Sequence, residues 1–139
     1  MKRIGGVRPD WGITVVRLMT GLIFAIHGYQ KFAGGLGGVT VFFEKVAIPF
    51  PGLMAPFIAI LELVGGLLLL VGVATRVIGV LLAVEMLVTT LWVQLPGRGW
   101  NASELDRMLL VACVLFVLAG PGAAALHRLW WEREEVAKG

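Results

Sequence analysis

Cysteine is almost absent from this sequence, because Cys113 is the single one among 139 residues. One thiol cannot form an internal disulfide, a Cys-x-x-Cys redox pair or a cysteine-rich metal site. Charged residues are scarce as well, at 15% of the chain, compared with about 25% in ordinary soluble domains. A disulfide-stabilised or metal-stabilised soluble domain is therefore excluded, and we expect no bound metal.

Hydrophobic residues take the place of the missing charges. They make up 58% of the chain, with a mean hydropathy of +0.89, whereas soluble domains are about 45–50% apolar. The net charge of +3 comes from basic residues scattered over flanks and loops, without the concentrated patch that a nucleic-acid partner requires. The composition predicts a membrane protein whose main partner is the lipid bilayer, with no nucleic-acid partner.

Long apolar segments account for most of this hydrophobicity. Each has about 20 residues or more, the length that a helix needs to cross the hydrocarbon core, and none shows the sustained two-residue alternation of a strand. We predict an all-α fold, a polytopic membrane four-helix bundle that forms one domain over residues 1–139. The predicted spans lie at about 11–33, 53–74, 76–95 and 105–126.

The connections between the spans predict their arrangement. Residues 34–52 contain glycines, an amphipathic stretch and two prolines, so we expect a short amphipathic outer segment between helices 1 and 2. The very short link at residues 74–76 predicts an antiparallel hairpin, and Gly120-Pro121-Gly122 should break the fourth span. With four spans, both termini lie on the same side of the membrane, and lysine and arginine are more frequent on that side. This predicts cytoplasmic N- and C-termini in a bacterial-type inner membrane.

A polar stripe interrupts the first span. Arg17, Thr20, His27 and Lys31 fall within an arc of about 80° when the segment is wound at 100° per residue. Charged groups in a membrane helix cannot face lipid cheaply, so this stripe must face protein or a polar cavity.

Two glutamates on other spans are the expected partners of this stripe. Glu62 and Glu85 lie near the middle of the second and third spans. We expect Arg17 to pair with the nearer glutamate and the other carboxyl to keep a proton. Such a pair could simply lock the bundle, but ionisable groups at this depth are functional candidates. The candidate catalytic residues are Glu62, Glu85 and His27, and the candidate ligand-binding residues are Arg17, Lys31, Gln30, Trp92 and Thr89, of which the last two share the helix face of Glu85.

The order of several short motifs resembles the DoxX family of membrane proteins. Together the motifs cover nearly the whole chain. The pattern departs from the family at Leu126-His127, where a Leu-Asp type ending is common. The matching pieces are Arg17-Leu18, His27-Gly28-Tyr29-Gln30-Lys31-Phe32, Ile48-Pro49, Glu62-Leu63-Val64-Gly65-Gly66, Gly72-Val73-Ala74-Thr75-Arg76, Glu104 and Gly120-Pro121-Gly122.

This resemblance implies a four-helix inner-membrane protein with redox partners, similar to the membrane subunit of a quinone-linked thiosulfate oxidoreductase. The sequence lacks a cysteine pair and the two deep histidines of a bis-histidine haem. If the chain carries out electron chemistry, quinone is therefore the expected carrier and a partner protein the expected electron donor. A small proton-coupled transporter would use the same charged residues. A non-catalytic scaffold that docks soluble redox enzymes would instead depend on the basic cytoplasmic flank and on Trp130 and Trp131. The sequence therefore does not decide whether the chain is part of an enzyme, nor whether it forms a homo-oligomer.

Overall fold

A computed structural model of the chain describes residues 8–126, and every regular element in this range is helical. The all-α prediction is therefore confirmed for the described residues. The elements in chain order are α1 (Pro9–Ala33), α2 (Leu36–Lys45), α3 (Pro51–Val71), α4 (Thr75–Val88), the π-helix η1 (Thr89–Gln94), α5 (Leu95–Gly97), α6 (Gly99–Ala102) and α7 (Glu104–Ala119).

Three helical stretches of the described chain are long and apolar enough to cross a membrane. They are α1, α3 and the continuous stretch Thr75–Gly97, which comprises α4, η1 and α5. The fourth predicted span, about 105–126, contains α7, which has only 16 residues. This helix ends at Ala119 because Gly120 adopts φ +80° and Pro121 follows. The predicted break at Gly120 is correct, whereas the predicted span boundary at 126 extends too far.

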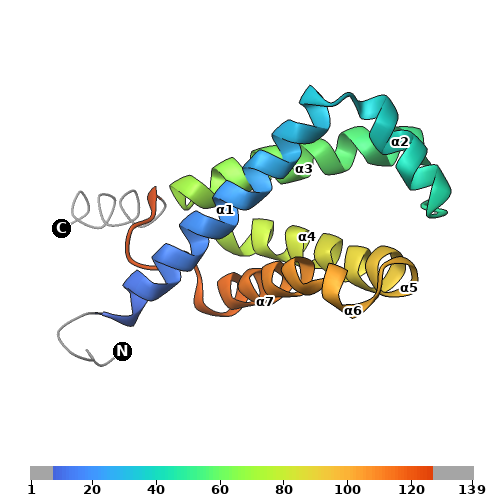
Figure 1. Cartoon of the computed structure of the whole chain (residues 1–139). Coiled ribbons are helices and arrows are strands. Elements are labelled where there is room, and N and C mark those ends of the chain that lie inside the picture. Colours follow the sequence, from blue (N-terminus) through green and yellow to red (C-terminus); the bar gives the residue numbers. More distant parts are fainter. Residues whose placement is uncertain (1–7, 127–139) are drawn as a thin grey trace.

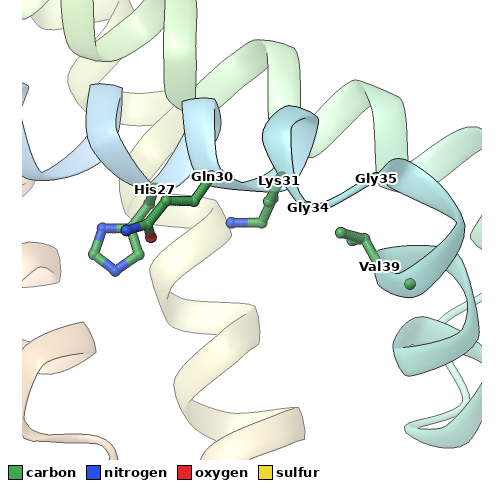
Figure 2. A pocket seen from close by; sticks show the side chains of 7 residues that line it. His27, Gln30, Lys31, Gly34, Gly35 and Val39 are labelled. Carbon is green, nitrogen blue, oxygen red and sulfur yellow. The ribbon is translucent and has the colours of Figure 1, made fainter.

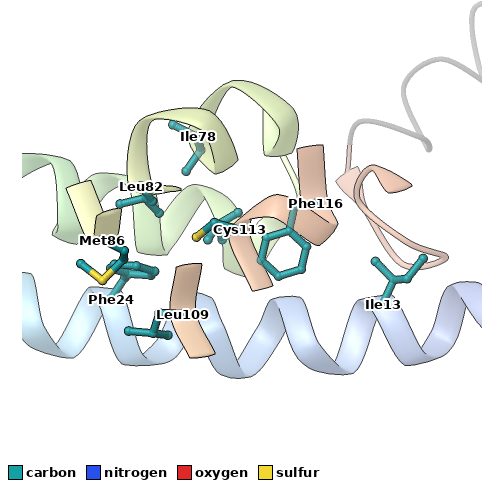
Figure 3. Packing of buried hydrophobic residues seen from close by; sticks show 9 residues of the cluster. Ile13, Phe24, Ile78, Leu82, Met86, Leu109, Cys113 and Phe116 are labelled. Atoms are coloured by element: carbon teal, nitrogen blue, oxygen red, sulfur yellow. The ribbon is translucent and has the colours of Figure 1, made fainter. Parts of the chain in front are cut away.

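The long helices form two packed pairs (Figure 1). Helix α1 lies along α3, and α4 lies along α7, with less extensive contact between the pairs. The hydrophobic core fills the space between them (Figure 3). Phe24 and Leu69 from the first pair meet Leu82, Cys113 and Phe116 from the second, and all five are fully buried.

Glycines bring α1 and α3 into backbone contact. A Cβ atom at Gly66 would lie 2.6 Å from the Gly21 carbonyl oxygen, and one at Gly28 would lie 2.7 Å from the Leu63 Cα atom. Small residues permit this close approach of membrane helices. Because Gly28 meets Leu63 while Gly21 meets Gly66 and Leu70, the helices are antiparallel, and the C-terminal end of α1 lies against the middle of α3.

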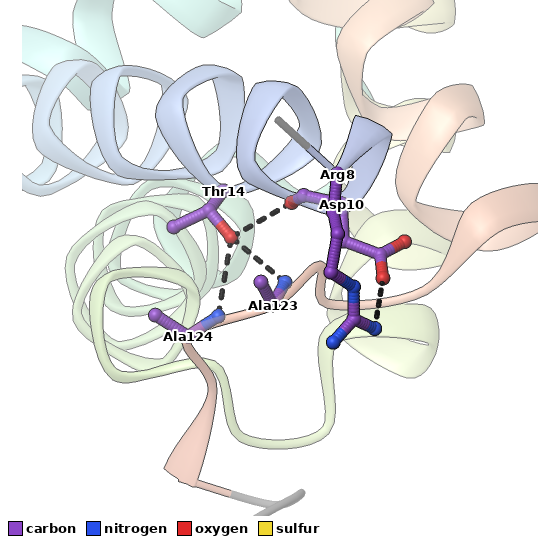
Figure 4. Close-up of polar contacts among 5 residues, drawn as sticks. All are labelled: Arg8, Asp10, Thr14, Ala123 and Ala124. Carbon is purple, nitrogen blue, oxygen red and sulfur yellow. Dashed lines mark hydrogen bonds and ion pairs between the residues drawn. The ribbon is translucent and has the colours of Figure 1, made fainter. Parts of the chain in front are cut away.

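The segment after α7 folds back onto the start of α1 (Figure 4). The Thr14 hydroxyl donates to the Asp10 carbonyl at 3.0 Å and accepts from the backbone N–H groups of Ala123 and Ala124 at 3.0 and 3.3 Å. Gly122 has φ +81°, and a Cβ atom there would lie 2.6 Å from the Thr14 hydroxyl oxygen. Hydrogen bonds therefore join the segment after α7 to the first turns of α1.

Candidate functional site

The Lys31 ammonium forms an ion pair with the Glu62 carboxylate and so joins α1 to α3. Lys31 lies in the last turn of α1 and Glu62 near the middle of α3. The antiparallel contact through Gly28 and Leu63 places these two side chains at the same level. Glu62 is buried, so this pair sits where water can only partly solvate it.

Arg17 lies far from this pair, about 21 Å from Lys31 along the axis of α1 at 1.5 Å per residue. Its guanidinium donates hydrogen bonds to the Leu69 carbonyl, at 2.8 Å, and to the Ala124 carbonyl. The ion pairs formed within residues 8–126 do not include Arg17. The predicted Arg17–glutamate pair is therefore wrong. The prediction assumed that the centres of the spans lie at the same depth in the membrane, whereas α1 is shifted along α3.

Glu85 brings α4 into the same polar cluster. Glu85 is 8% exposed, and its Oε2 atom has no hydrogen-bond partner among residues 8–126. Its charged neighbours are Glu62, which has the largest electrostatic effect on it, and Lys31 and Asp106, whose effects are smaller. The two glutamates predicted as partners of one site therefore do interact, with Lys31 as the cation between α1 and α3.

Asp106 on α7 and Gln94 on η1 extend the cluster, and neither was predicted from the sequence. Asp106 and Gln94 lie next to each other, and Asp106 also lies near His27, Glu62 and Lys31. Asp106 Oδ2 and Gln94 Oε1 are buried without a hydrogen-bond partner. On an α-helix Gln94 would lie about 180° from Glu85, but the π-helical turn changes that rotation. No sequence pattern marked this turn.

A cavity of about 300 Å³ opens beside this cluster, where α1 gives way to α2 (Figure 2). Figure 2 shows the side chains of His27, Gln30 and Lys31 on the cavity side of α1. The glycines between the helices and Val39 of α2 complete its wall. Three candidate residues from the sequence therefore share one cavity, and Lys31 connects that cavity to buried Glu62.

The tautomer of His27 follows from its hydrogen bond. Its Nδ1 atom lies 2.8 Å from the Ile23 carbonyl oxygen, which can only accept, so Nδ1 carries the proton. Nε2 of the neutral ring is then an acceptor. His27 can therefore receive a proton or a hydrogen bond from a molecule in the cavity.

Thr89 and Trp92 make contacts of another kind. The Thr89 hydroxyl donates to the Glu85 carbonyl at 2.9 Å, and the Trp92 indole N–H donates to the Val46 carbonyl at 3.0 Å. Trp92 is 57% exposed and does not line the 300 Å³ cavity. Its observed contact joins η1 to the end of α2, and ligand binding by these two residues stays a prediction. The described residues contain no group of side chains suited to hold a metal ion.

Several known proteins are similar to this chain over most of their length. The chain is 36% identical to the "Putative oxidoreductase CatD" of Bacillus subtilis (strain 168) over 115 residues, which is 83% of this chain and 84% of that protein. It is 30% identical to the "Inner membrane protein YqjF" of Escherichia coli (strain K12), over 86% of this chain and 92% of that protein.

A third relative is the "Uncharacterized membrane protein Rv3486" of Mycobacterium tuberculosis (strain ATCC 25618 / H37Rv), 30% identical over 89% of this chain and 90% of that protein. No solved structure is a significant match. The DoxX family profile matches residues 12–95, which include α1, α3, α4 and all the cavity residues. The chain is a membrane protein of the DoxX family.

Proposed function

We propose that this chain is the quinone-interacting subunit of a membrane redox system, with the quinone headgroup bound in the 300 Å³ cavity. The observation that carries the proposal is the Lys31–Glu62 ion pair, which links the cavity wall to the buried Glu85 carboxyl. Such a site supplies a cation at the headgroup and carboxyls behind it. The name of the Bacillus subtilis relative, which includes the word oxidoreductase, supports the same class of function.

The chemistry divides between this chain and a partner. Reducing a quinone to a hydroquinone takes two electrons and two protons, and forms two O–H bonds. A partner protein with its own redox group supplies the electrons, since one cysteine and two histidines leave this chain few redox ligands. Lys31 and Gln30 donate hydrogen bonds to the quinone oxygens and stabilise the negative charge that develops there.

Protons reach the quinone through the carboxyl cluster. Lys31 is the cation paired with Glu62, and Glu85 adds a second carboxyl beside it. Two carboxylates with one cation would leave a net charge in a medium of low dielectric constant, which is costly. The Glu62–Glu85 pair therefore holds one proton at a time and passes it to a quinone oxygen, directly or through His27. Water re-protonates the pair before it delivers the second proton.

The proposal includes an orientation in the membrane. Both termini lie on the cytoplasmic side, and the cavity at the α1–α2 junction lies towards the outer side. Helix α7 serves as the fourth span, because it packs along α4 and buries Leu109, Cys113 and Phe116 in the core.

A ligand titration tests the site. Purified chain in detergent is titrated with a short-chain ubiquinone or menaquinone analogue, and binding is followed by tryptophan fluorescence. We expect Lys31→Met and Glu62→Gln each to weaken binding by about tenfold, the effect of losing one charge-assisted hydrogen bond. Lys45→Met and Glu44→Gln change exposed charges on α2 and should leave binding unchanged. Equal affinities in all five proteins would reject the site.

A small proton-coupled transporter is the second candidate. The carboxyls of Glu85 and Asp106 and the π-helical break at Thr89–Gln94 lie within one helical pair, and non-standard helix segments are frequent at functional sites. Liposomes loaded with a pH-sensitive dye discriminate the two: absence of proton flux under every imposed gradient would reject the transporter.

The scaffold alternative depended on Trp130 and Trp131, which lie outside the described residues. Partner capture before and after truncation at about residue 127 tests it.

A further inference from the structure

A second cavity lies at the opposite end of the molecule from α2, at the turn between α3 and α4 (Figure 1). Its volume is about 160 Å³, enough for a small polyatomic group. The quinone proposal does not use it. Its lining residues are Gly72, Ala74, Thr75, Arg76, Val77 and Pro121.

The cavity is flanked by two arginines without a carboxylate partner among residues 8–126. Arg76 lines it directly and is exposed. Arg17 lies against Gly72 so closely that a Cβ atom on that glycine would collide with Nη1. Arg17 is 1% exposed, and within the described part of the chain its Nε atom has no hydrogen-bond partner. A buried cation balanced only by carbonyl groups leaves this end of the molecule electrostatically suited to an anion.

The N-terminus of α4 forms part of the wall of the same cavity. No side chain caps this helix, and its first internal bond runs from the Ile78 N–H to the Ala74 carbonyl. The N–H groups of the residues from Thr75 to Val77 precede that bond and point away from the helix, as the first donors of any helix do. The Thr75 hydroxyl is also unpartnered, although Thr75 is only 4% exposed. The first residues of α4, including Thr75 and Arg76, thus all line one cavity.

We propose that this cavity binds a phosphate group, supplied by the headgroup of an anionic phospholipid. A helix N-terminus with a nearby arginine is well suited to phosphate oxygens. The setting favours a lipid source, because Val71 and Val77 beside the cavity are 49% and 62% exposed and offer apolar surface to acyl chains. The turn lies at the end of two membrane-spanning helices, at the level where headgroups are found.

Thermal unfolding of the full chain in detergent tests this site without any quinone. Phosphatidylglycerol, phosphatidylcholine and inorganic phosphate are added separately. Phosphatidylglycerol should raise the melting temperature of the wild type. Arg76→Gln and Thr75→Val should each raise the lipid concentration that is needed, Arg76→Gln by about tenfold. Arg8→Gln is the matched control, because Arg8 is an exposed arginine at the same end that pairs with Asp10 instead.

Comparing the three additions distinguishes a lipid phosphate from a soluble one. Protection by inorganic phosphate that equals protection by phosphatidylglycerol, and that is lost in Arg76→Gln, would support the site with a soluble ligand. Equal protection by phosphatidylcholine and phosphatidylglycerol would overturn the proposal. It would also be overturned if no addition shifts the wild type, or if both variants respond as the wild type does.

Discussion

At the residue scale, the two inward-facing cations of α1, buried Arg17 and half-buried Lys31, meet different acceptors. Lys31 meets the carboxylate of Glu62, whereas Arg17 meets the carbonyls of Leu69 and Ala124. The Leu69 carbonyl belongs to the last turn of α3, which carries the negative end of the helix dipole and unpaired acceptors. A guanidinium has several donors in a fixed plane and can satisfy two such carbonyls at once. Arg17 therefore connects α1, α3 and the segment after α7.

Replacing Arg17 should destabilise the protein. Arg17→Gln loses two charge-assisted hydrogen bonds, to the Leu69 and Ala124 carbonyls, at an expected cost of about 3 kcal/mol. Thermal or denaturant unfolding in detergent measures the loss. Arg8→Gln, in which an exposed ion pair is removed, should cost less than about 1 kcal/mol. Equal small losses in both variants would show that Arg17 is solvated rather than buried.

The Lys31–Glu62 pair should behave as a coupled unit. Glu62→Leu alone leaves the Lys31 ammonium without its counter-ion and should cost about 3–5 kcal/mol. The double variant Lys31→Met/Glu62→Leu should recover most of that loss, because an apolar pair of similar size has no charge to solvate. A double-mutant cycle by unfolding measures the coupling, with Lys45→Met as the exposed single control. Additive losses would mean that the two side chains act independently.

At the element scale, the register of α1 on α3 decides which polar residues meet. Gly21, Gly28 and Gly66 have no room for a Cβ atom against the facing backbone. This contact holds α1 so that Lys31 faces the middle of α3 while Arg17 reaches its C-terminal end. The π-helix η1 has a comparable effect on the third helical stretch, since it brings Gln94 to the same cluster as Asp106.

Two glycine-to-alanine variants should have opposite effects. Gly66→Ala places a Cβ atom 2.6 Å from the Gly21 carbonyl oxygen, so the helices must separate, and we expect a loss of about 1–3 kcal/mol. Gly12 also lies in a helix, but a Cβ atom there would have no neighbour within 4 Å. Gly12→Ala should therefore stabilise by about 0.5–1 kcal/mol through helix propensity. Unfolding midpoints that move in the same direction would contradict the close packing of α1 on α3.

At the scale of the whole molecule, the surface is that of a protein in lipid. Large apolar side chains are exposed along the outward faces of the long helices, such as Val15 at 65%, Met19 at 58% and Leu67 at 50%. Water would disfavour so much apolar surface, whereas hydrocarbon does not. The polar groups instead gather inside the protein or at its two ends.

Cysteine labelling should reveal the orientation. The native Cys113 is fully buried and should not react, so the wild type is its own background. Gly37→Cys on α2 should react with a membrane-impermeant maleimide added to intact cells. Arg8→Cys, at the opposite end, should react only after the membrane is permeabilised. The reverse pattern would place the N-terminus and the phosphate cavity outside and the α1–α2 cavity inside.

The sequence by itself determined the fold class, the three long spans and several polar residues that face the protein interior. These follow from local properties: apolar length predicts a membrane helix, and a charge inside such a helix must face protein. His27, Lys31, Glu62 and Glu85 were found in this way, and Gln30 through the motif that resembles the DoxX family. Glycine and proline also marked the end of α7 correctly.

Tertiary structure alone decided which of these residues meet. The partner of Glu62 depends on how far α1 is shifted along α3, and that shift is set by backbone contacts at glycines on two separate helices. The inclusion of Gln94 and Asp106 depends on a π-helical turn and on the packing of α7 against α4. Hydrophobic periodicity specifies which face of a helix is buried but not its position along its axis. Only the packed structure could therefore show that Lys31, and not Arg17, pairs with Glu62.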